Sequence, residues 1–329
     1  MKKISSILLT GIMLGIALIA HSTILRVNNT PAITVPYATF QAAYNVAVNG
    51  DTIYLEGSGY TYGTLNISKS LVIIGPGYYL NQNPETQANI ASASVDNLNL
   101  NSGSSGTKII GLDINTILNS YQFILQDFVF MRNKINSQMY SNYGSNSLTS
   151  YYSNIVFEQN FVSGTLTGRF ENAVFRNNVF ISGITLNSLN NSLSFTNNVV
   201  GNANITMAAQ CSNNIFFGTS CTFTNCLLSN NVCSATQAPA GNGNQQNVNM
   251  NDVFVCYTTC TGYSADARYQ LKAGSPAIGA GSNGEDCGMF GGSDPYVLSG
   301  IPPIPAIYYF NYNYNNAMIN VDMKVKSHN

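Results

Sequence analysis

Six segments in the middle of the chain share one pattern: an apolar residue, two further residues and an asparagine, followed in five of the six by another apolar residue. They read FMRNK, FEQNF, FRNNV, FTNNV, CSNNI and LSNNV, and the intervals between their asparagines are 27, 18, 20, 16 and 17 residues. A unit that returns about every 20 residues is typical of a solenoid, in which each repeat forms one coil. The repeat therefore predicts a stack of similar coils. The six asparagines are Asn133, Asn160, Asn178, Asn198, Asn214 and Asn231.

The composition favours β-structure and excludes one class of partner. Charged residues make up 8% of the chain, against about 25% in an average protein, and the net charge is -1. Without a basic excess, we expect no nucleic-acid partner. The chain is 45% hydrophobic, with many Val, Ile, Phe and Tyr, and its polar part is mostly Asn, Ser, Thr and Gly. That mixture is typical of strands joined by tight turns.

The first 22 residues read as an export signal. Lys2 and Lys3 precede an apolar stretch, Ile7–Ala20, and Ala20 and Ser22 are the small residues that a signal peptidase reads. The stretch is short for a membrane span of about 20 residues, although an uncleaved anchor helix is an alternative. We expect an exported protein, extracellular, at the cell surface or periplasmic, with no transmembrane span after signal removal.

A single amphipathic helix is expected over Thr39–Val48. Thr39 can cap it, apolar residues at spacings of three and four share one face, and Asn49-Gly50 can end it. The strand TIYLE follows directly. A helix placed before a run of strands suggests a cap over the open end of a solenoid, where strand edges must be covered.

Three segments carry a resemblance to a known fold: NGDTIYLEG at Asn49–Gly57, ISKSLVIIGPGY at Ile67–Tyr78 and YQLKAGSPAIGAG at Tyr269–Gly281. With the stacked asparagine turns, the chain resembles the right-handed parallel β-helix of the pectate-lyase-like superfold over about residues 36–292. With GMFGG at Gly288–Gly292 and GIPPIPAIY at Gly300–Tyr308, it is also similar to exported Bacteroidetes β-helix repeat proteins without an assigned activity.

The expected fold is all-β: a right-handed parallel β-helix with an N-terminal cap helix and a short C-terminal β extension. We divide the chain into a signal peptide (1–22), the capped β-helix (23–292) and a Pro- and Tyr-rich extension with a strand (293–329). In the extension, Ala317–Lys326 alternates polar and apolar residues and predicts a half-buried strand. We expect this strand to dock on the solenoid, with a binding platform as the alternative. Residues 237–251, rich in Asn, Gln and Gly, predict a long loop leaving the coils.

Each coil is expected to present columns of equivalent residues. The position of Phe157 and Phe175 points inward, and Cys211 occupies it in a later coil, so we expect Cys211 and Cys233 to pack as small apolar residues rather than to bind metal. Cys256 and Cys260 fall outside the columns. The asparagine side chains are expected to turn toward the backbone and toward one another, since amides stack in this way and Asn tolerates the left-handed conformation of sharp turns. The outward column that varies between coils is Met131, Glu158, Arg176, Thr196, Ser212 and Ser229.

Catalytic chemistry has few candidates in this sequence. The two histidines are His21 and His328, outside the coils, which removes histidine triads and histidine zinc sites from them. The densest charge group is Glu158, Arg169, Glu171 and Arg176. Glu158 and Arg176 are 18 residues apart, one coil, and we expect a surface ion pair worth about 0–1 kcal/mol. Arg169 and Glu171 share a face of one strand.

A short acidic turn is the remaining candidate for ion binding. Ser282–Gly288 could hold a cation, but it lacks the alternation of a Ca²⁺ loop and coincides with the closing motif. A structural turn is the favoured interpretation.

Three hypotheses for function follow. The first is a non-catalytic β-helix protein whose flat faces of Asn, Ser, Thr and Tyr contact a polysaccharide or a surface protein; it needs no cofactor. The second is a polysaccharide lyase or glycoside hydrolase using Glu158, Arg169, Glu171 and Arg176, for which the resemblance implies Ca²⁺ in the lyase case. The third is a subunit of an extracellular assembly whose tail strand joins a neighbour; the oligomeric state is left open.

Overall fold

The computed structural model describes residues 22–119, 123–140, 151–258, 261–315 and 318–327. Residues 1–21 of the expected signal peptide, both histidines and Cys260 lie outside the described residues. Among the described residues, no helix is both long and apolar enough to cross a membrane.

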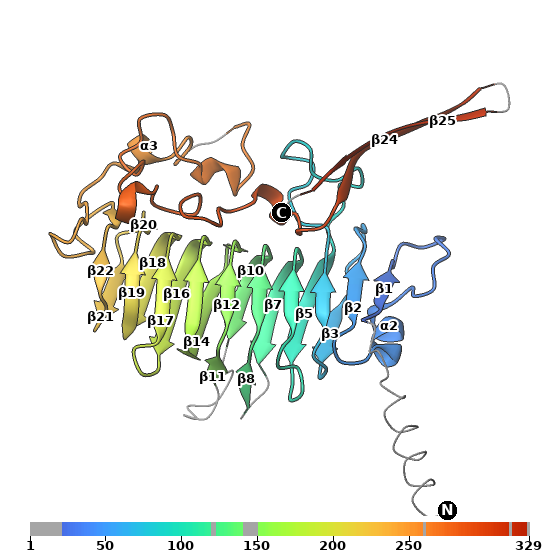
Figure 1. Ribbon diagram of the computed structural model, residues 1–329, viewed down its shortest axis with the longest axis horizontal. Coiled ribbons are helices and arrows are strands. Elements are labelled where there is room, and N and C mark those ends of the chain that lie inside the picture. Colours follow the sequence, from blue (N-terminus) through green and yellow to red (C-terminus); the bar gives the residue numbers. More distant parts are fainter. Residues whose placement is uncertain (1–21, 120–122, 141–150, 259–260, 316–317, 328–329) are drawn as a thin grey trace, which may run out of the picture.

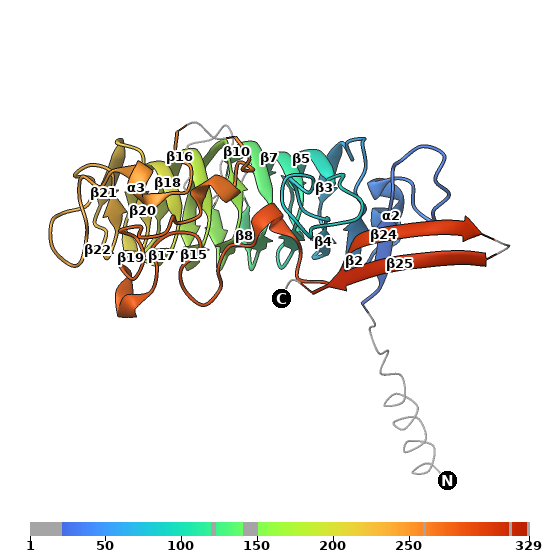
Figure 2. The ribbon, with the colours of Figure 1, turned by 90° about the horizontal axis from the view of Figure 1, so that it is seen from above.

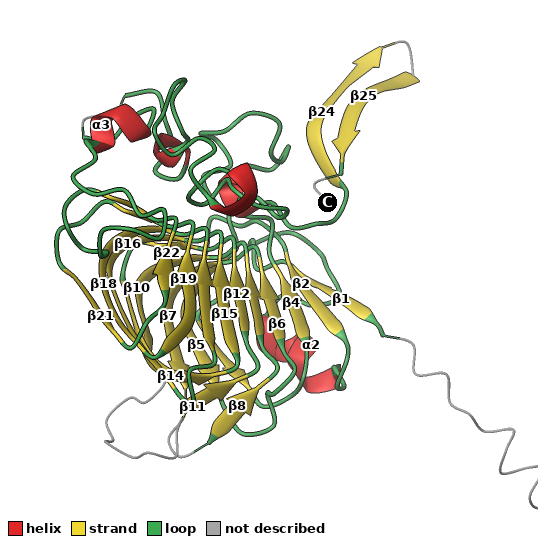
Figure 3. Ribbon diagram, turned by 60° about the vertical axis from the view of Figure 1, so that its left-hand side comes forward, coloured by secondary structure: helices red, strands yellow, loops and turns green. Residues whose placement is uncertain are grey.

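The chain winds into a parallel β-helix, which confirms the predicted fold. Two long parallel sheets lie face to face, and successive coils add one neighbour to each (Figure 3). Because each strand pairs with the equivalent strand one coil away, equivalent residues lie in register: Phe157 pairs with Phe130 on one side and Phe175 on the other. The repeat in the sequence is therefore the coil of the structure.

The described residues form a 10-stranded and a 13-stranded sheet in the solenoid. The first sheet consists, in order, of β1 (Ile24–Val27), β2 (Thr52–Leu55), β4 (Val72–Ile74), β6 (Lys108–Ile110), β9 (Val129–Met131), β12 (Val156–Glu158), β15 (Ala173–Arg176), β17 (Leu193–Thr196), β19 (Ala208–Ser212) and β22 (Leu228–Ser229). The second contains β3 (Thr64–Ile67), β5 (Ser94–Leu100), β7 (Asp113–Asn119), β8 (Ile124–Gln126), β10 (Lys134–Tyr140), β11 (Tyr151–Ser153), β13 (Phe161–Val162), β14 (Thr165–Glu171), β16 (Val179–Ser188), β18 (Val199–Thr206), β20 (Ile215–Phe216), β21 (Cys221–Thr224) and β23 (Val232–Cys233).

The core between the sheets is built from inward columns. One column of the 10-stranded sheet brings aromatic rings into contact in a tilted arrangement, with centroids 5.7 Å apart for Phe130 and Phe157 and 5.3 Å for Phe157 and Phe175. Each fully buried side chain of this size contributes about 1.5–3 kcal/mol. Cys211 continues the column and is fully buried, as predicted. The whole column is Ile53, Ile73, Ile109, Phe130, Phe157, Phe175, Phe195, Cys211 and Leu228.

The cap helix α2 (Phe40–Val46) forms where it was predicted. The Thr39 side chain accepts a hydrogen bond from the backbone N–H of Ala42, and Phe40 and Ala43 are buried against the first coil. The helix ends at Val46, earlier than expected, and Gly50 takes the left-handed conformation (φ 92°) in the turn into β2. Its apolar face closes the N-terminal end of the core.

The segment expected to leave the coils stays with them instead. Gln245 forms a parallel bridge with Val232, and Asn244 accepts a hydrogen bond from the Asn231 side chain at 3.0 Å. The prediction of a long departing loop was wrong because these side chains extend the asparagine stack by one more turn. The short helix α3 (Met250–Val253) follows.

The chain then runs back along the solenoid. Residues 277–301, which we call the strap, lie along the edge where the two sheets meet (Figures 1 and 3). The strap crosses the expected boundary at residue 292. It contains the turns η2 (Ser282–Gly284) and η3 (Leu298–Gly300), and η1 (Ala267–Tyr269) precedes it.

The last two strands form a separate antiparallel hairpin, which we call the ribbon. It consists of β24 (Ala306–Asn315) and β25 (Met318–Lys326), and it projects past the N-terminal end of the solenoid (Figures 1 and 2). The expectation that the second strand docks on the solenoid was wrong: it pairs with β24, and every residue of β25 is exposed. The base of the ribbon is held by an ion pair between Lys326 and Glu85 at 2.8 Å.

Candidate functional site

The structure divides the four candidate catalytic residues between the two sheets. Glu158 and Arg176 lie in register on β12 and β15 of the 10-stranded sheet, whereas Arg169 and Glu171 lie on β14 of the 13-stranded sheet. Glu171 accepts hydrogen bonds from Ser153 and Asn190. The arrangement therefore gives two pairs rather than one cluster of four.

The first pair is not the surface ion pair that the spacing suggested. The Glu158 side chain is 7% exposed, and its Oε2 lies 2.6 Å from an Arg176 guanidinium nitrogen. Arg176 also reaches Asp294 of the strap at 3.3 Å. The expectation failed because the strap covers this part of the sheet, so the pair ties the coils to the strap.

The predicted turn asparagines form a continuous stack. In each coil the Nδ2 group of one asparagine donates to the Oδ1 atom of the next, over 3.0–3.1 Å. The backbone N–H of each also donates to that oxygen, as Asn178 does to Asn198. All six side chains are fully buried. Because a buried amide without partners would cost free energy, this stack explains why asparagine recurs at the position.

The left-handed turn falls one residue earlier than the sequence interpretation placed it. The residue before each stacked asparagine has φ between 54° and 59°. Asparagine is favoured there because it tolerates this region, which accounts for the N-N pairs in the later repeats. These left-handed residues are Arg132, Gln159, Asn177, Asn197, Asn213 and Asn230.

The side chains of this left-handed column bind the strap. Asn177 donates to the carbonyl oxygens of Met289 and Gly291 at 3.0 and 2.7 Å. Gln159 donates to those of Asp294 and Pro295 in the same way. Arg132, Asn197 and Asn230 donate likewise to the carbonyl oxygens of Ile301, Asp286 and Ala280. Asn213 donates instead to the hydroxyl oxygen of Ser282. Each coil thus supplies one anchor, and the strap runs antiparallel to the coil order.

An outward apolar stripe lies beside these anchors, and sequence reasoning missed it. In five of the six repeats the stacked asparagine is followed by two apolar residues, whereas Lys134 follows Asn133. The second of the two points into the solenoid, and the first points out and packs against residues of the strap such as Met289 and Tyr296. Two consecutive apolar residues on a strand cannot both face inward. The additional apolar residue in these repeats therefore indicated that another segment of the chain would pack on the outer side of the strands. The stripe is Phe161, Val179, Val199, Ile215 and Val232.

A buried polar network pins the strap to the first coils. The hydroxyl oxygens of Tyr78 and Tyr296 lie 2.6 Å apart, and Tyr296 donates to the fully buried carboxylate of Asp266 at 3.3 Å. The backbone N–H of Ser299 donates to the same carboxylate at 2.8 Å. Burial raises the pKa of both tyrosines well above the ordinary value, so both phenols remain protonated. The network is closed to solvent and holds the fold together.

The outer face of the 13-stranded sheet is different, because the strap runs along the edge of the solenoid and does not cross this face (Figure 1). Over β14, β16, β18 and β21, its outward positions are occupied by hydroxyl and amide side chains, in register from coil to coil. Neighbouring strands lie about 4.8 Å apart. Arg169, with Glu171 at the strand end, supplies its charge. We call this surface the Thr/Asn face; its residues are Thr165, Thr167, Arg169, Thr185, Asn187, Asn202, Asn204, Thr206, Thr222 and Thr224.

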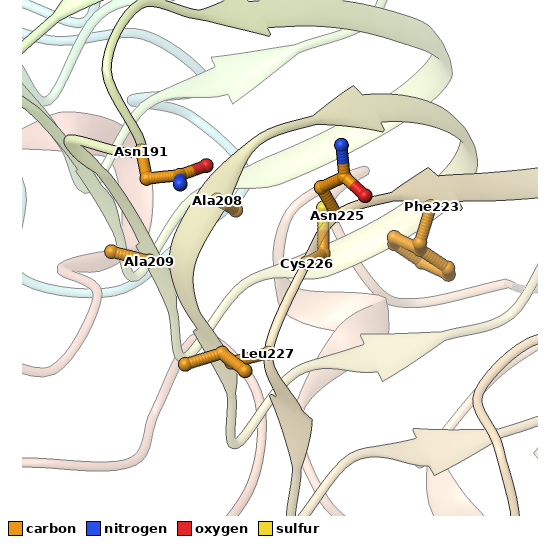
Figure 4. A pocket seen from close by; sticks show the side chains of 7 residues that line it. All are labelled: Asn191, Ala208, Ala209, Phe223, Asn225, Cys226 and Leu227. Carbon is orange, nitrogen blue, oxygen red and sulfur yellow. The ribbon is translucent and has the colours of Figure 1, made fainter.

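A shallow pocket adjoins this face at the end of β21 (Figure 4). Its volume is about 490 Å³, and it lies between the turn after β21 and the start of β19. Leu227 is 72% exposed, and the amides of Asn191 and Asn225 come from different turns. A pocket of carbon walls with two amides suits a neutral ligand that has both apolar and hydrogen-bonding surfaces. The lining residues are Asn191, Ala208, Ala209, Phe223, Asn225, Cys226 and Leu227.

The described part of the chain holds no group of three or more His, Cys, Asp or Glu side chains that could bind a metal ion. Cys211, Cys233 and Cys287 are free and buried, whereas Cys256 is disulfide-bonded. Burial raises the pKa of Cys233 to about 11. In the Ser282–Gly288 turn, the Asp286 carboxylate accepts from the backbone N–H of Gly279, which makes it part of the turn.

Comparison with known proteins finds a similarity of fold. Among solved structures, the chain is similar to the pectate lyase Pel9A, with 14% identity over 83% of this chain and 97% of that chain, and a TM-score of 0.31. No protein-family model matches the chain, and no curated protein matches it. A pectate-lyase-like parallel β-helix fits the sheet topology, and no activity is transferred from this similarity.

Proposed function

We propose that this protein is an exported, non-catalytic β-helix protein that binds a neutral glycan along the Thr/Asn face. The observation that carries the proposal is the repetition of exposed or half-buried hydroxyl and amide groups on the outer side of one sheet, one set per coil. A glycan presents hydroxyl groups at regular intervals, and each can donate to an amide oxygen or accept from a threonine hydroxyl. A regular row of such groups suits an extended chain of sugars.

Two features of the face support a neutral ligand. The side chains of Thr167, Thr185 and Asn204 make no hydrogen bond to another described residue, so their capacity is available to a ligand. The charge of the face is confined to the coil of β14, so an acidic polysaccharide would find one guanidinium, that of Arg169, on it. The adjoining pocket, with Leu227 at its margin, offers an apolar surface to a sugar ring.

The test is binding to a panel of neutral and acidic polysaccharides by affinity electrophoresis and calorimetry. We expect one neutral polysaccharide to bind, and Thr185→Val, which removes a hydroxyl and keeps the shape, to weaken binding about two- to tenfold, as loss of one hydrogen bond requires. The matched control is Thr196→Val on the 10-stranded sheet, which should leave affinity unchanged.

Three results would contradict the proposal. The first is no binding to any member of the panel, and the second is equal loss in both variants. The third is depolymerisation of a polysaccharide that Glu171→Gln abolishes, which would establish the polysaccharide-cleaving alternative in place of simple contact.

A further inference from the structure

The ribbon is amphipathic, and its apolar face is bare. Tyr314 pairs with Ile319, Tyr312 with Val321 and Phe310 with Met323, so these side chains share one face. The opposite face pairs Asn313 with Asn320 and Asn311 with Asp322, and Lys324 lies over the Tyr309 ring. The apolar face consists of Ile307, Phe310, Tyr312, Tyr314, Ile319, Val321, Met323 and Val325, which are 42–72% exposed.

This face is large enough for a stable interface. It carries three aromatic and five aliphatic side chains, each about half to three-quarters exposed. With about 150–250 Å² per aromatic side chain, the exposed area is on the order of 800 Å², which is one partner's share of a standard protein interface. An exposed apolar patch of this size on a protein surface marks an interaction site.

The ribbon also requires support that the described chain does not supply along its length. Within the described residues it is a sheet of two strands, attached at its base by Lys326 and by a hydrogen bond from Ala88 to Ile307. An isolated two-stranded hairpin is marginally stable in water, and packing of a hydrophobic face is what stabilises it. The bare face is where that packing must occur.

We propose that the apolar face of the ribbon binds the same face of a second copy of this chain. The face holds no charged side chain, so a copy can cover it without burying an unpaired charge. Asp322 and Lys324 remain in solvent on the reverse face. Two ribbons stacked about a two-fold axis make a small four-stranded sandwich, about 10 Å thick, in which each face covers the other.

The position and charge of the ribbon favour this partner over a lipid surface. It projects beyond the N-terminal coil in both perpendicular views, so two ribbons can meet without collision of the solenoids (Figures 1 and 2). A membrane-surface element would carry an excess of Lys and Arg on its polar face. On this one Asp322 balances Lys324, and Lys326 is paired with Glu85. The dimer is independent of the proposed glycan contact, which uses a different face.

Sedimentation velocity of the full chain tests the proposal. Over about 1–100 µM, a range that brackets a micromolar dissociation constant, we expect the chain mass to double. Val321→Lys on the apolar face should weaken the dimer at least tenfold. Asn320→Lys, the matched control, places the same charge on the neighbouring residue of the polar face and should leave the dimer intact. Phe310→Asp and its control Asn313→Asp repeat the comparison on the other strand, and circular dichroism confirms that each variant keeps its solenoid.

Several outcomes would overturn the proposal. A wild-type chain that is monomeric throughout the range would do so, as would equal effects of Val321→Lys and Asn320→Lys. Oligomers larger than a dimer would mean that the ribbons associate through hydrogen bonds between their strand edges and not through their apolar faces. Flotation of the chain with neutral phosphatidylcholine vesicles, lost in Val321→Lys, would assign the face to a lipid surface.

Discussion

The solenoid and the ribbon both present an apolar face outside the main core, and the chain covers one of them. The solenoid stripe, which includes Val199 and Ile215, is fully buried beneath the strap. The ribbon face is exposed, and two of its residues, Tyr312 and Ile319, are 66% and 68% exposed. Similar side chains on similar strands have thus reached opposite environments in one molecule.

The difference lies in what crosses each surface. The strap has an anchor on each coil of the asparagine stack, so its backbone is bound by side chains of Asn177, Asn197 and their equivalents, and its own apolar residues fill the stripe. The ribbon extends past the first coil at the N-terminal end of the solenoid, where the described chain supplies no such anchors. The chain buries the apolar stripe of the solenoid but leaves the apolar face of the ribbon exposed to solvent. We therefore interpret the ribbon face as a surface that packs against another molecule.

The largest expected effect comes from placing one charge in each region. Met289 in the strap is 1% exposed and Met323 on the ribbon is 51% exposed. Met289→Asp buries an unpaired carboxylate and should lower the free energy of unfolding by more than about 4 kcal/mol. Met323→Asp should change it by less than about 0.5 kcal/mol in dilute solution. Urea denaturation below the dimer range measures both, and equal losses would show that the ribbon face is already covered within the monomer.

A second comparison separates the two asparagines of one turn. Asn178→Ala breaks the buried stack and leaves the backbone N–H of Asn160 and the Phe157 carbonyl without their partner, so we expect a loss of about 2–4 kcal/mol. Asn177→Gly removes two bonds to the strap but relieves the left-handed backbone, and should cost about 1 kcal/mol. Denaturation midpoints decide the order; a larger loss in Asn177→Gly would mean that the strap, and not the stack, dominates stability at this coil.

The last comparison concerns alkaline pH. Burial raises the pKa of Cys287 to about 12, with the Asp286 carboxylate and Cys233 adding to the rise. Because the pKa of the folded state is the higher one, the contribution to stability is complete below the ordinary thiol pKa of about 8.5 and is lost as the pH rises toward 12. When the pH rises from 9 to 11, the free energy of unfolding of Cys287→Ala should fall by about 2 kcal/mol less than that of the wild type. Identical pH profiles for the two proteins would show that water reaches the covered stripe.

Much of the fold followed from the spacing of a few residues. The interval between asparagines predicted parallel coils, and the apolar residue three positions earlier predicted the inward column that Phe157 and Cys211 share. The candidate site was harder to predict from the sequence. The register of Glu158 and Arg176 was predictable, but the burial of Glu158 was not, because the strap residue Asp294, which Arg176 also contacts, lies 118 residues further along the chain than Arg176.

The sequence by itself determined the local repeat: which residues turn, which point inward and which stack from coil to coil. These properties depend on contacts between neighbouring coils, which a period near 20 residues encodes directly. The tertiary structure decided what covers each outward surface, namely that the strap returns over the stripe of Val179 and Val199, that the Thr/Asn face stays open, and that the ribbon extends free of the coils. Whether an outward surface is buried depends on where segments distant in sequence pack in space. The local repeat of the coils does not encode that packing.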